Sequence, residues 1–242
     1  MLLLPGLATI FHQDSHHTAP RSLLVDVGAH RGDFTARMLQ LFSDSHGRPY
    51  RRFLEPAAFL AFEPNPRTFE GLRARALEGG WGELGFCALP AALGSAKGGH
   101  TTFFALHEAK DSEMSALDAG HVEGQQLQHF PHDKVEMEVH GLDSWLWELH
   151  PPGINGSAAK EVCPSVFTST PVLSRVADEI FLLKIDAQGH DDQVLRGAEQ
   201  LFLNRRVRFL LFEYEYAGEP RSVDAHRALK ETIEASVGAM RT

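Results

Sequence analysis

The stretch Leu23-Leu-Val-Asp-Val-Gly-Ala-His-Arg-Gly-Asp-Phe34 decides the fold of this protein of 242 residues. It is an apolar run that ends in an acid, followed by a turn with two glycines and the start of a helical pattern. An apolar run of this length is typical of a strand buried on both faces. Gly28 and Gly32 permit a tight turn and a close approach of the backbone to a ligand. We therefore expect a strand, a turn and a helix, with Asp26 pointing at a ligand from the strand's end.

The rest of the chain continues this alternation. Helical spacing over 34–42 is followed by an apolar run at 59–63, and a second helical pattern covers 67–77. Further strands are expected at 84–89, 101–106, 135–140, 180–186 and 207–213, and further helices at 142–149, 191–202 and 223–236. Strands that alternate with helices and are apolar on both faces predict an α/β fold with a doubly wound, mostly parallel sheet. Ligands of such sheets bind at the carboxyl ends of the strands.

The length and composition fit one globular domain over residues 21–242, preceded by an N-terminal segment at 1–20. Residues 1–11 are apolar but lack a basic start and are too short to span a bilayer, so no membrane span is expected. The stretch 151–178 is rich in Pro, Ser, Gly and Thr. We interpret it as a surface insertion within the domain that is suited to act as a substrate lid.

The formal net charge of -9 argues against a protein that neutralises nucleic-acid phosphates, so a small-molecule substrate is expected. Cys87 and Cys163 show neither a disulfide framework nor zinc-ligand spacing. The 14 histidines are scattered and are interpreted as solvated surface residues. Nothing identifies a compartment, and a cytoplasmic location is the default.

The glycine turn departs from the dinucleotide fingerprint, because Ala29 follows Gly28 and the next glycine is Gly32. This spacing disfavours NAD binding. Preceded by Asp26, it instead resembles the first motif of S-adenosylmethionine-dependent methyltransferases. Glu63, at the end of the second predicted strand, is placed to accept hydrogen bonds from both hydroxyls of a ribose.

The order of six motifs closely resembles the FkbM-type family of S-adenosylmethionine-dependent methyltransferases over residues 22–216. The motifs are Val25-Asp-Val-Gly-Ala-His-Arg-Gly32, Phe62-Glu-Pro-Asn-Pro66, Ala91-Ala-Leu-Gly94, Gly141-Leu-Asp-Ser144, Leu183-Lys-Ile-Asp-Ala-Gln-Gly-His-Asp-Asp-Gln-Val-Leu-Arg-Gly-Ala198 and Phe212-Glu-Tyr-Glu215. The resemblance implies a class I methyltransferase (Rossmann-like) fold, S-adenosylmethionine as methyl donor, and O-methylation of a hydroxyl on a small molecule or sugar-containing compound. The cofactor-binding residues expected on these motifs are Asp26, Gly28, Ala29, His30, Gly32, Glu63, Asn65 and Ala92.

The chain departs from the family pattern in three ways. Gln188 replaces the Glu of a Lys-Ile-Asp-x-Glu-Gly motif, and His30 stands where Asn is frequent. The family fold ends in an antiparallel strand pair, and no apolar run follows the last predicted helix, so this pair is expected to be absent. The strand at 207–213 would then be a hydrophobic edge that needs cover from a second copy or from the N-terminal segment. A homodimer is one expectation.

Methyl transfer to an alcohol needs a base that removes the hydroxyl proton. The candidates are Asp186, His190 and Glu213. The ordinary pKa of a histidine, about 6.5, suits this role better than that of an aspartate, which burial would have to raise. Helix capping is the alternative role for Asp186 and His190. No metal site is expected, because the helix dipole already explains acids at the start of a helix.

Lys184, which precedes Asp186 by two residues on a predicted strand, has two interpretations. It contacts substrate, or it pairs with a neighbouring acid, which is the more common fate of such a lysine.

Three other functions remain open. The first is a catalytically impaired protein of the same fold that acts as a binding or interaction module. Gln188 and the expected absence of the terminal strands favour this alternative. A methyltransferase acting on nucleic-acid or protein nitrogen is less favoured, because Lys-Ile-Asp-Ala at 184–187 is not an Asn-Pro-Pro-aromatic turn. A nicotinamide oxidoreductase is the least favoured.

Overall fold

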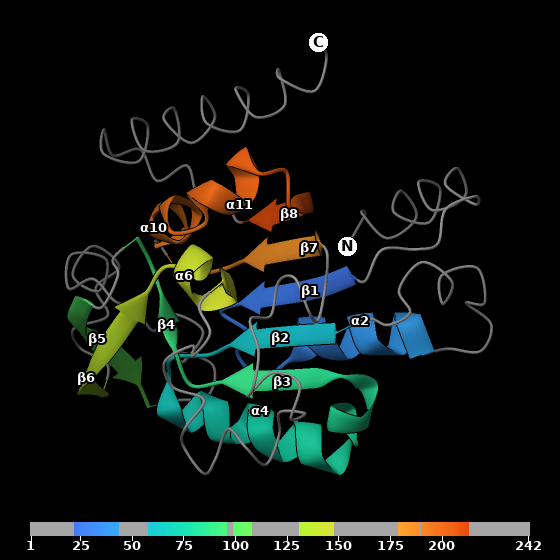
Figure 1. The fold of residues 1–242 in the computed structure, drawn as a ribbon. Helices are drawn as coiled ribbons and strands as arrows, with labels where there is room; N and C mark the ends of the chain where they lie inside the picture. The colour runs from blue at the N-terminus through green and yellow to red at the C-terminus, as the bar shows by residue number, and fades with distance from the viewer. Residues whose placement is uncertain are drawn as a thin grey trace, which may run out of the picture.

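The centre of the protein is a five-stranded parallel sheet. The computed structural model describes residues 22–43, 58–95, 99–107, 131–147, 179–188 and 190–212. The sheet has the order β3-β2-β1-β7-β8, and every pairing in it is parallel. Its strands are β1 (Ser22–Val27), β2 (Ala58–Phe62), β3 (Phe86–Leu89), β7 (Glu179–Ile185) and β8 (Val207–Phe212). This is the Rossmann-like order, and it confirms the predicted α/β class (Figure 1).

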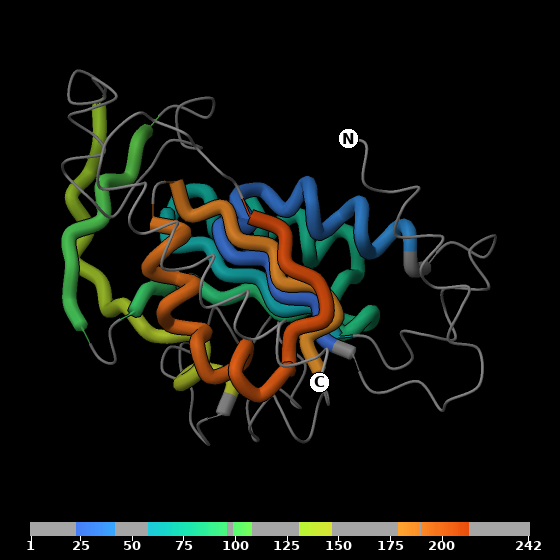
Figure 2. Tube along the Cα trace, turned by 90° about the horizontal axis from the view of Figure 1, so that it is seen from above, coloured from blue at the N-terminus to red at the C-terminus, as the bar shows by residue number. Residues whose placement is uncertain are grey.

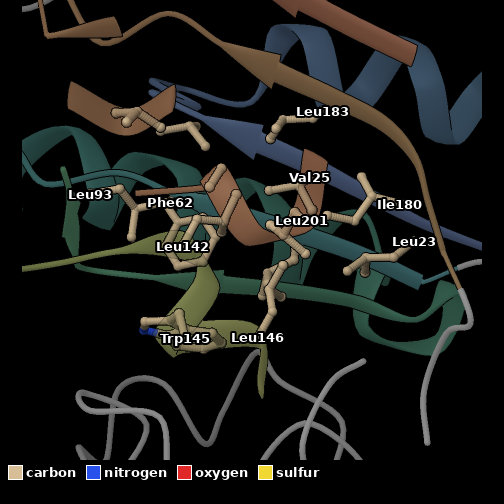
Figure 3. Close-up of a cluster of buried hydrophobic side chains, with 14 of the residues drawn as sticks. Leu23, Val25, Phe62, Leu93, Leu142, Trp145, Leu146, Ile180, Leu183 and Leu201 are labelled. Atoms are coloured by element: carbon tan, nitrogen blue, oxygen red, sulfur yellow. The ribbon is translucent and has the colours of Figure 1, made fainter. Parts of the chain in front are cut away.

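Helices cover both faces of this sheet, as a doubly wound fold requires (Figure 2). One face carries α2 (Asp33–Ser43) and α4 (Pro66–Glu78), and the other carries α6 (Leu142–Trp147), α10 (Asp191–Arg196) and α11 (Glu199–Leu203). Side chains alternate along β1: Leu23 and Val25 pack with α6, α10 and α11, whereas Leu24 packs with α2 and α4. Figure 3 shows the first of these two cores, in which the buried Trp145 of α6 lies at 5.1 Å from the ring of Phe62.

A second, three-stranded sheet lies beyond the carboxyl ends of β1, β2 and β7 (Figures 1 and 2). It has the order β4-β6-β5, with β4 (Ala92–Leu93) parallel and β5 (Gly99–Leu106) antiparallel to β6 (His132–His140). The sequence predicted the strands at 101–106 and 135–140 but not that they leave the parallel sheet. Along β6, exposed and half-buried residues alternate, which is the pattern of an antiparallel sheet with one solvated face.

Two predicted elements differ in the structure. The helix expected over 191–202 is broken into α10 and α11 at Gly197. A Cβ at Gly197 would lie 2.1 Å from the carbonyl oxygen of Gly94. Close packing of two backbone segments therefore requires a glycine here, and helix propensity does not decide the residue. The strand expected at 84–89 is shorter, since Trp81–Leu84 form a 3-10 helix, η2, that ends at Gly85 in the left-handed region.

Among the described strands, β8 lies at the end of the sheet and is half-buried along most of its length. The sequence predicted a buried strand that becomes a hydrophobic edge where no strand pair covers it. Cys87 in β3 is disulfide-bonded, which its sequence spacing did not indicate. Within the described part of the chain, no helix is long and apolar enough to cross a membrane. Several predicted features lie outside the described residues: the segment 1–20, the insertion 151–178, the helix 223–236 and Glu213.

Candidate functional site

A cavity of about 420 Å³ opens where the strand order reverses. From β1 the chain proceeds to β2 and β3 on one side, whereas β7 and β8 extend the sheet on the other. Ligands of open α/β sheets bind at this switch point. The cavity volume is within the range of about 300–1,000 Å³ typical of small-molecule sites. The lining consists of Val27, Gly28, Ala29, His30, Asp33, Phe34, Phe62, Glu63, Pro64, Ala91, Ala92, Leu93, Phe103, Lys184, Asp186, Ala187 and Gln188.

The turn after β1 forms one wall of the cavity. Gly28 has a φ of 71°, and its amide donates to the carbonyl of Phe62 at 3.0 Å. A Cβ at this position would lie 1.8 Å from the carbonyl oxygen of Asp186. The glycine is therefore required because the end of β7 packs against it, and the sequence-based reason, close approach of a ligand, is not needed to explain it. Ala29 and His30, the next two residues, line the cavity.

Glu63 is 6% exposed, yet it lines the cavity just beyond β2. Its Oε2 accepts a hydrogen bond from the amide of His30 at 2.7 Å, and its Oε1 accepts one from the amide of Asn65 at 2.8 Å. Burial raises the pKa of Glu63 to about 7, although both amides act to lower it. Each carboxylate oxygen keeps a lone pair after these bonds. The structure thus presents an oriented acceptor to the cavity.

Asp26 is not among the residues that line the cavity, although the sequence predicted that it points at a ligand. It is 4% exposed, and its Oδ2 accepts from the hydroxyl of Thr35 in α2 at 2.8 Å. Its Oδ1 lies 3.1 Å from Nζ of Lys184. The two residues are register partners across β1 and β7. Asp26 therefore stabilises the site indirectly, because its contacts hold α2 and β7 against β1.

Lys184 forms the ion pair that was expected as its more common fate, and it also lines the cavity. Contact with a substrate stays a prediction. The ammonium of Lys184 donates to the carbonyl of Gly28 at 2.8 Å and lies 3.4 Å from Oδ2 of Asp186. The flanking carboxylates raise its pKa against the opposing effect of burial, so Lys184 is charged. It lies 6.0 Å from the ring centroid of Phe34, which also lines the cavity.

Asp186 lines the cavity at the end of β7, and its side chain is 38% exposed. Its Oδ1 accepts a hydrogen bond from Nε2 of Gln188 at 2.8 Å. Gln188 has a φ of 49°, a conformation rare for a residue with a side chain. The amide at position 188 therefore donates to the carboxylate, whereas a glutamate there would place two carboxylates side by side.

His190 is not part of the cavity lining. It occupies the N-cap position of α10 without a side-chain capping bond, so the capping role foreseen for its side chain is absent. The neighbouring Asp191 accepts from the amide of Ala187 at 3.4 Å instead. Of the three candidate bases, the structure thus brings Asp186 to the cavity, leaves His190 away from it, and does not describe Glu213.

Of the other predicted cofactor residues, some line the cavity and others hold the turns next to it. Ala92 lines the cavity. Asn65 is fully buried and caps α4 by accepting from the amide of Arg67 at 3.0 Å. Gly32, with a φ of 76°, leaves room for Leu72, whose Cδ1 would lie 2.6 Å from a Cβ at this position. Asn65 and Gly32 therefore shape the turns on which the lining residues lie.

Sequence reasoning did not propose Asp33, Phe34 or Phe103 as site residues, although all three line the cavity. Asp33 and Phe34 were assigned to the start and apolar face of a helix, and that spacing carries no sign of a ligand. Phe103 belongs to β5 in the second sheet, so only the tertiary arrangement brings it here. In the part of the chain described, no group of three or more His, Cys, Asp or Glu is placed to hold a metal ion.

No protein-family model and no curated protein matches the sequence. Among solved structures, the fold is similar to the crystal structure of methyltransferase FkbM from Methylobacillus flagellatus KT, with a TM-score of 0.39 and 12% sequence identity. The alignment covers 81% of this chain and 34% of that chain, so the protein spans about a third of the length of the one it matches.

Proposed function

We propose that this protein is an S-adenosylmethionine-dependent methyltransferase that methylates a hydroxyl oxygen of a small molecule or sugar-containing compound. The observation that carries the proposal is Glu63, a buried carboxylate oriented by two backbone amides at the rim of the switch-point cavity. A carboxylate is the side chain best suited to accept bonds from both hydroxyls of a ribose. The glycine turn lines the same cavity of about 420 Å³, in which the rest of the cofactor would lie.

The charges of the lining favour a cationic cofactor over a nicotinamide dinucleotide. The described lining residues include one ammonium group, that of Lys184, and three acids: Asp33, Glu63 and Asp186. A sulfonium and an amino group gain from such surroundings, whereas the diphosphate of NAD is repelled by them. This balance agrees with the absence of the Gly-x-Gly-x-x-Gly fingerprint from the turn.

The cofactor supplies an activated methyl group on sulfur, and the protein supplies binding, orientation and a proton acceptor. Glu63 binds the ribose. Asp186 is the described candidate base at the cavity, and it accepts the proton of the acceptor hydroxyl in this proposal. Lys184 fixes the position of the Asp186 carboxylate, since its ammonium lies 3.4 Å from Oδ2.

The second candidate is a binding module with the same fold and little catalysis. It is favoured by the contacts of Asp186, because Lys184 lies 3.4 Å from Oδ2 and Gln188 donates to Oδ1, so both oxygens of the candidate base already have protein partners. This candidate predicts that the cofactor binds and that no methyl group is transferred.

Calorimetric titration with S-adenosylmethionine, S-adenosylhomocysteine and NAD tests the proposal. We expect saturable binding of the first two and none of NAD. Glu63→Gln should weaken binding of both sulfur compounds by at least tenfold, and Glu83→Gln, an exposed acid on η2 outside the cavity, is the matched control. Preference for NAD would refute the proposal.

Transfer of a tritiated methyl group into pools of hydroxylated metabolites separates the two candidates. For the enzyme, we expect incorporation that Asp186→Asn abolishes while cofactor binding is kept. Binding without incorporation into any acceptor pool would favour the module.

A further inference from the structure

A second hollow lies beside the glycine turn and outside the cofactor cavity. It is a groove of about 340 Å³ between the turn, α4 and the end of β5. Its lining brings together Arg31, Arg67, Arg75 and His107, and we call it the arginine groove. None of its described lining residues is a carboxylate, in a chain whose formal net charge is -9.

The guanidinium groups of α4 are held in place by acids that lie outside the lining. Arg75 donates to Asp33 Oδ1 at 2.6 Å and to the carbonyl of Arg31 at 3.0 Å, and it lies 5.7 Å from the ring centroid of Trp81. Arg67, also on α4, and His107, just after β5, both lie 3.0 Å from Oδ2 of Asp133. These partners orient Arg75, Arg67 and His107 before any ligand arrives, which lowers the entropic cost of binding.

Gly71 forms the floor of the groove between two of the arginines. Positions 67, 71 and 75 are four residues apart and lie on one face of α4. A glycine inside a helix is less favourable than an alanine. A Cβ at Gly71 would meet nothing within 4 Å, so packing does not explain the glycine. Its effect is to leave open space between Arg67 and Arg75.

Arg31, in the glycine turn, completes the cationic lining. It is exposed, and the structure gives its side chain no ion pair with any described residue. Arginine forks match the oxygens of a phosphate group in both geometry and charge. We propose that the arginine groove binds the phosphate group of a small-molecule phosphate monoester. This site does not depend on the cofactor cavity being a methyltransferase site.

Calorimetry with inorganic phosphate and glucose 6-phosphate tests the proposal, with glucose as the uncharged control and chloride used to hold ionic strength constant. We expect saturable binding of both phosphates and none of glucose. Arg31→Gln and Gly71→Gln should each weaken binding by at least tenfold. Gly71→Gln keeps every charge and fills the floor, and thermal unfolding should show that it is at least as stable as the parent protein.

Arg73→Gln is the matched control. It removes an arginine of α4 that pairs with Glu70 at 2.9 Å and does not line the groove, so phosphate binding should stay unchanged. The proposal is overturned if neither phosphate binds, if Gly71→Gln binds them as the parent does, or if Arg73→Gln loses as much affinity as Arg31→Gln. Acetate binding as tightly as phosphate would also overturn it, because the groove would then select charge alone.

Discussion

Glu63 is deeply buried and lies at the cavity rim, so its protonation state is coupled to ligand binding. Burial raises its pKa to about 7 in the free protein. Hydroxyl donors from a ribose favour the ionised form and lower that pKa again. Binding of the cofactor should therefore release a proton near neutral pH.

We expect the affinity for S-adenosylhomocysteine to fall about tenfold between pH 8 and pH 6, because about nine tenths of Glu63 is protonated one unit below its pKa. The measurement is calorimetric titration at each pH in two buffers of different ionisation enthalpy. In Glu63→Gln the remaining affinity should not change with pH through this residue. A parent protein with equal affinity at both pH values would contradict the assignment.

The same group affects stability in the opposite sense to a salt-bridged acid. Its folded pKa of about 7 lies above the ordinary 4.5, so the folded state binds the proton more tightly than the unfolded state does. The contribution of Glu63 to the free energy of unfolding is therefore expected to fall as the pH rises from about 4.5 to about 7. Urea unfolding of the parent and Glu63→Gln across this range measures that contribution.

Gly28 and Gly80 can be compared directly, because both have a positive φ, of 71° and 61°. A methyl group at Gly80 meets nothing within 4 Å, whereas one at Gly28 overlaps the carbonyl of Asp186. We expect Gly80→Ala to cost about 1 kcal/mol from backbone strain alone. Gly28→Ala should cost about 3 kcal/mol, because overpacking is added to that strain. Denaturant unfolding checks both, and equal losses would show that the overlap relaxes freely.

At the scale of the elements, the Lys184 side chain joins the carboxyl ends of β1 and β7. It contacts Asp26 at 3.1 Å and the carbonyl of Gly28 at 2.8 Å, and all of these groups lie beneath or beside the cavity. The site thus depends on a charged crosslink between two strands that are far apart in the sequence.

Lys184→Met should lower the free energy of unfolding by about 3 kcal/mol, since it leaves the Asp26 carboxylate buried without its cation. Adding Asp26→Asn to this variant removes that charge and should recover part of the loss. Chemical unfolding of the four members of the cycle gives the coupling. Additive losses would show that the ion pair does not join the strands.

At the scale of the whole molecule, the cavity is built from both halves of the sheet, because the turn after β1 and the end of β7 face it together. A ligand in the cavity should stabilise both halves at once. At a concentration 100 times its dissociation constant, S-adenosylhomocysteine is expected to add about 2.7 kcal/mol to the stability.

Amide hydrogen exchange locates this effect. We expect slower exchange at Ala29 after β1 and at Ala187 after β7 when S-adenosylhomocysteine is bound, and no change with NAD. Protection confined to one of the two strand ends would contradict a ligand at the switch point.

The parallel strands could be predicted because each is a short apolar run, and because glycine or proline follows the first three of them within two residues, as in Leu23–Val27 and Ala58–Phe62. The acids after β2 and β7 were also correctly placed at the cavity, because the carboxyl ends of parallel strands meet at one edge. The orientation of Asp26 could not be predicted. It depends on Thr35 and Lys184, which reach it from other elements.

Local pattern in the sequence determined the α/β class, the glycine turn and the residue types at the strand ends, because strand burial, turn geometry and helix starts depend on near neighbours in the chain. Tertiary structure alone decided that β5 and β6 form a separate sheet, that Phe103 reaches the cavity, and that Gly28 is required by Asp186. These outcomes depend on contacts between residues distant in sequence, whose distances follow from packing and leave no periodic signal in the chain.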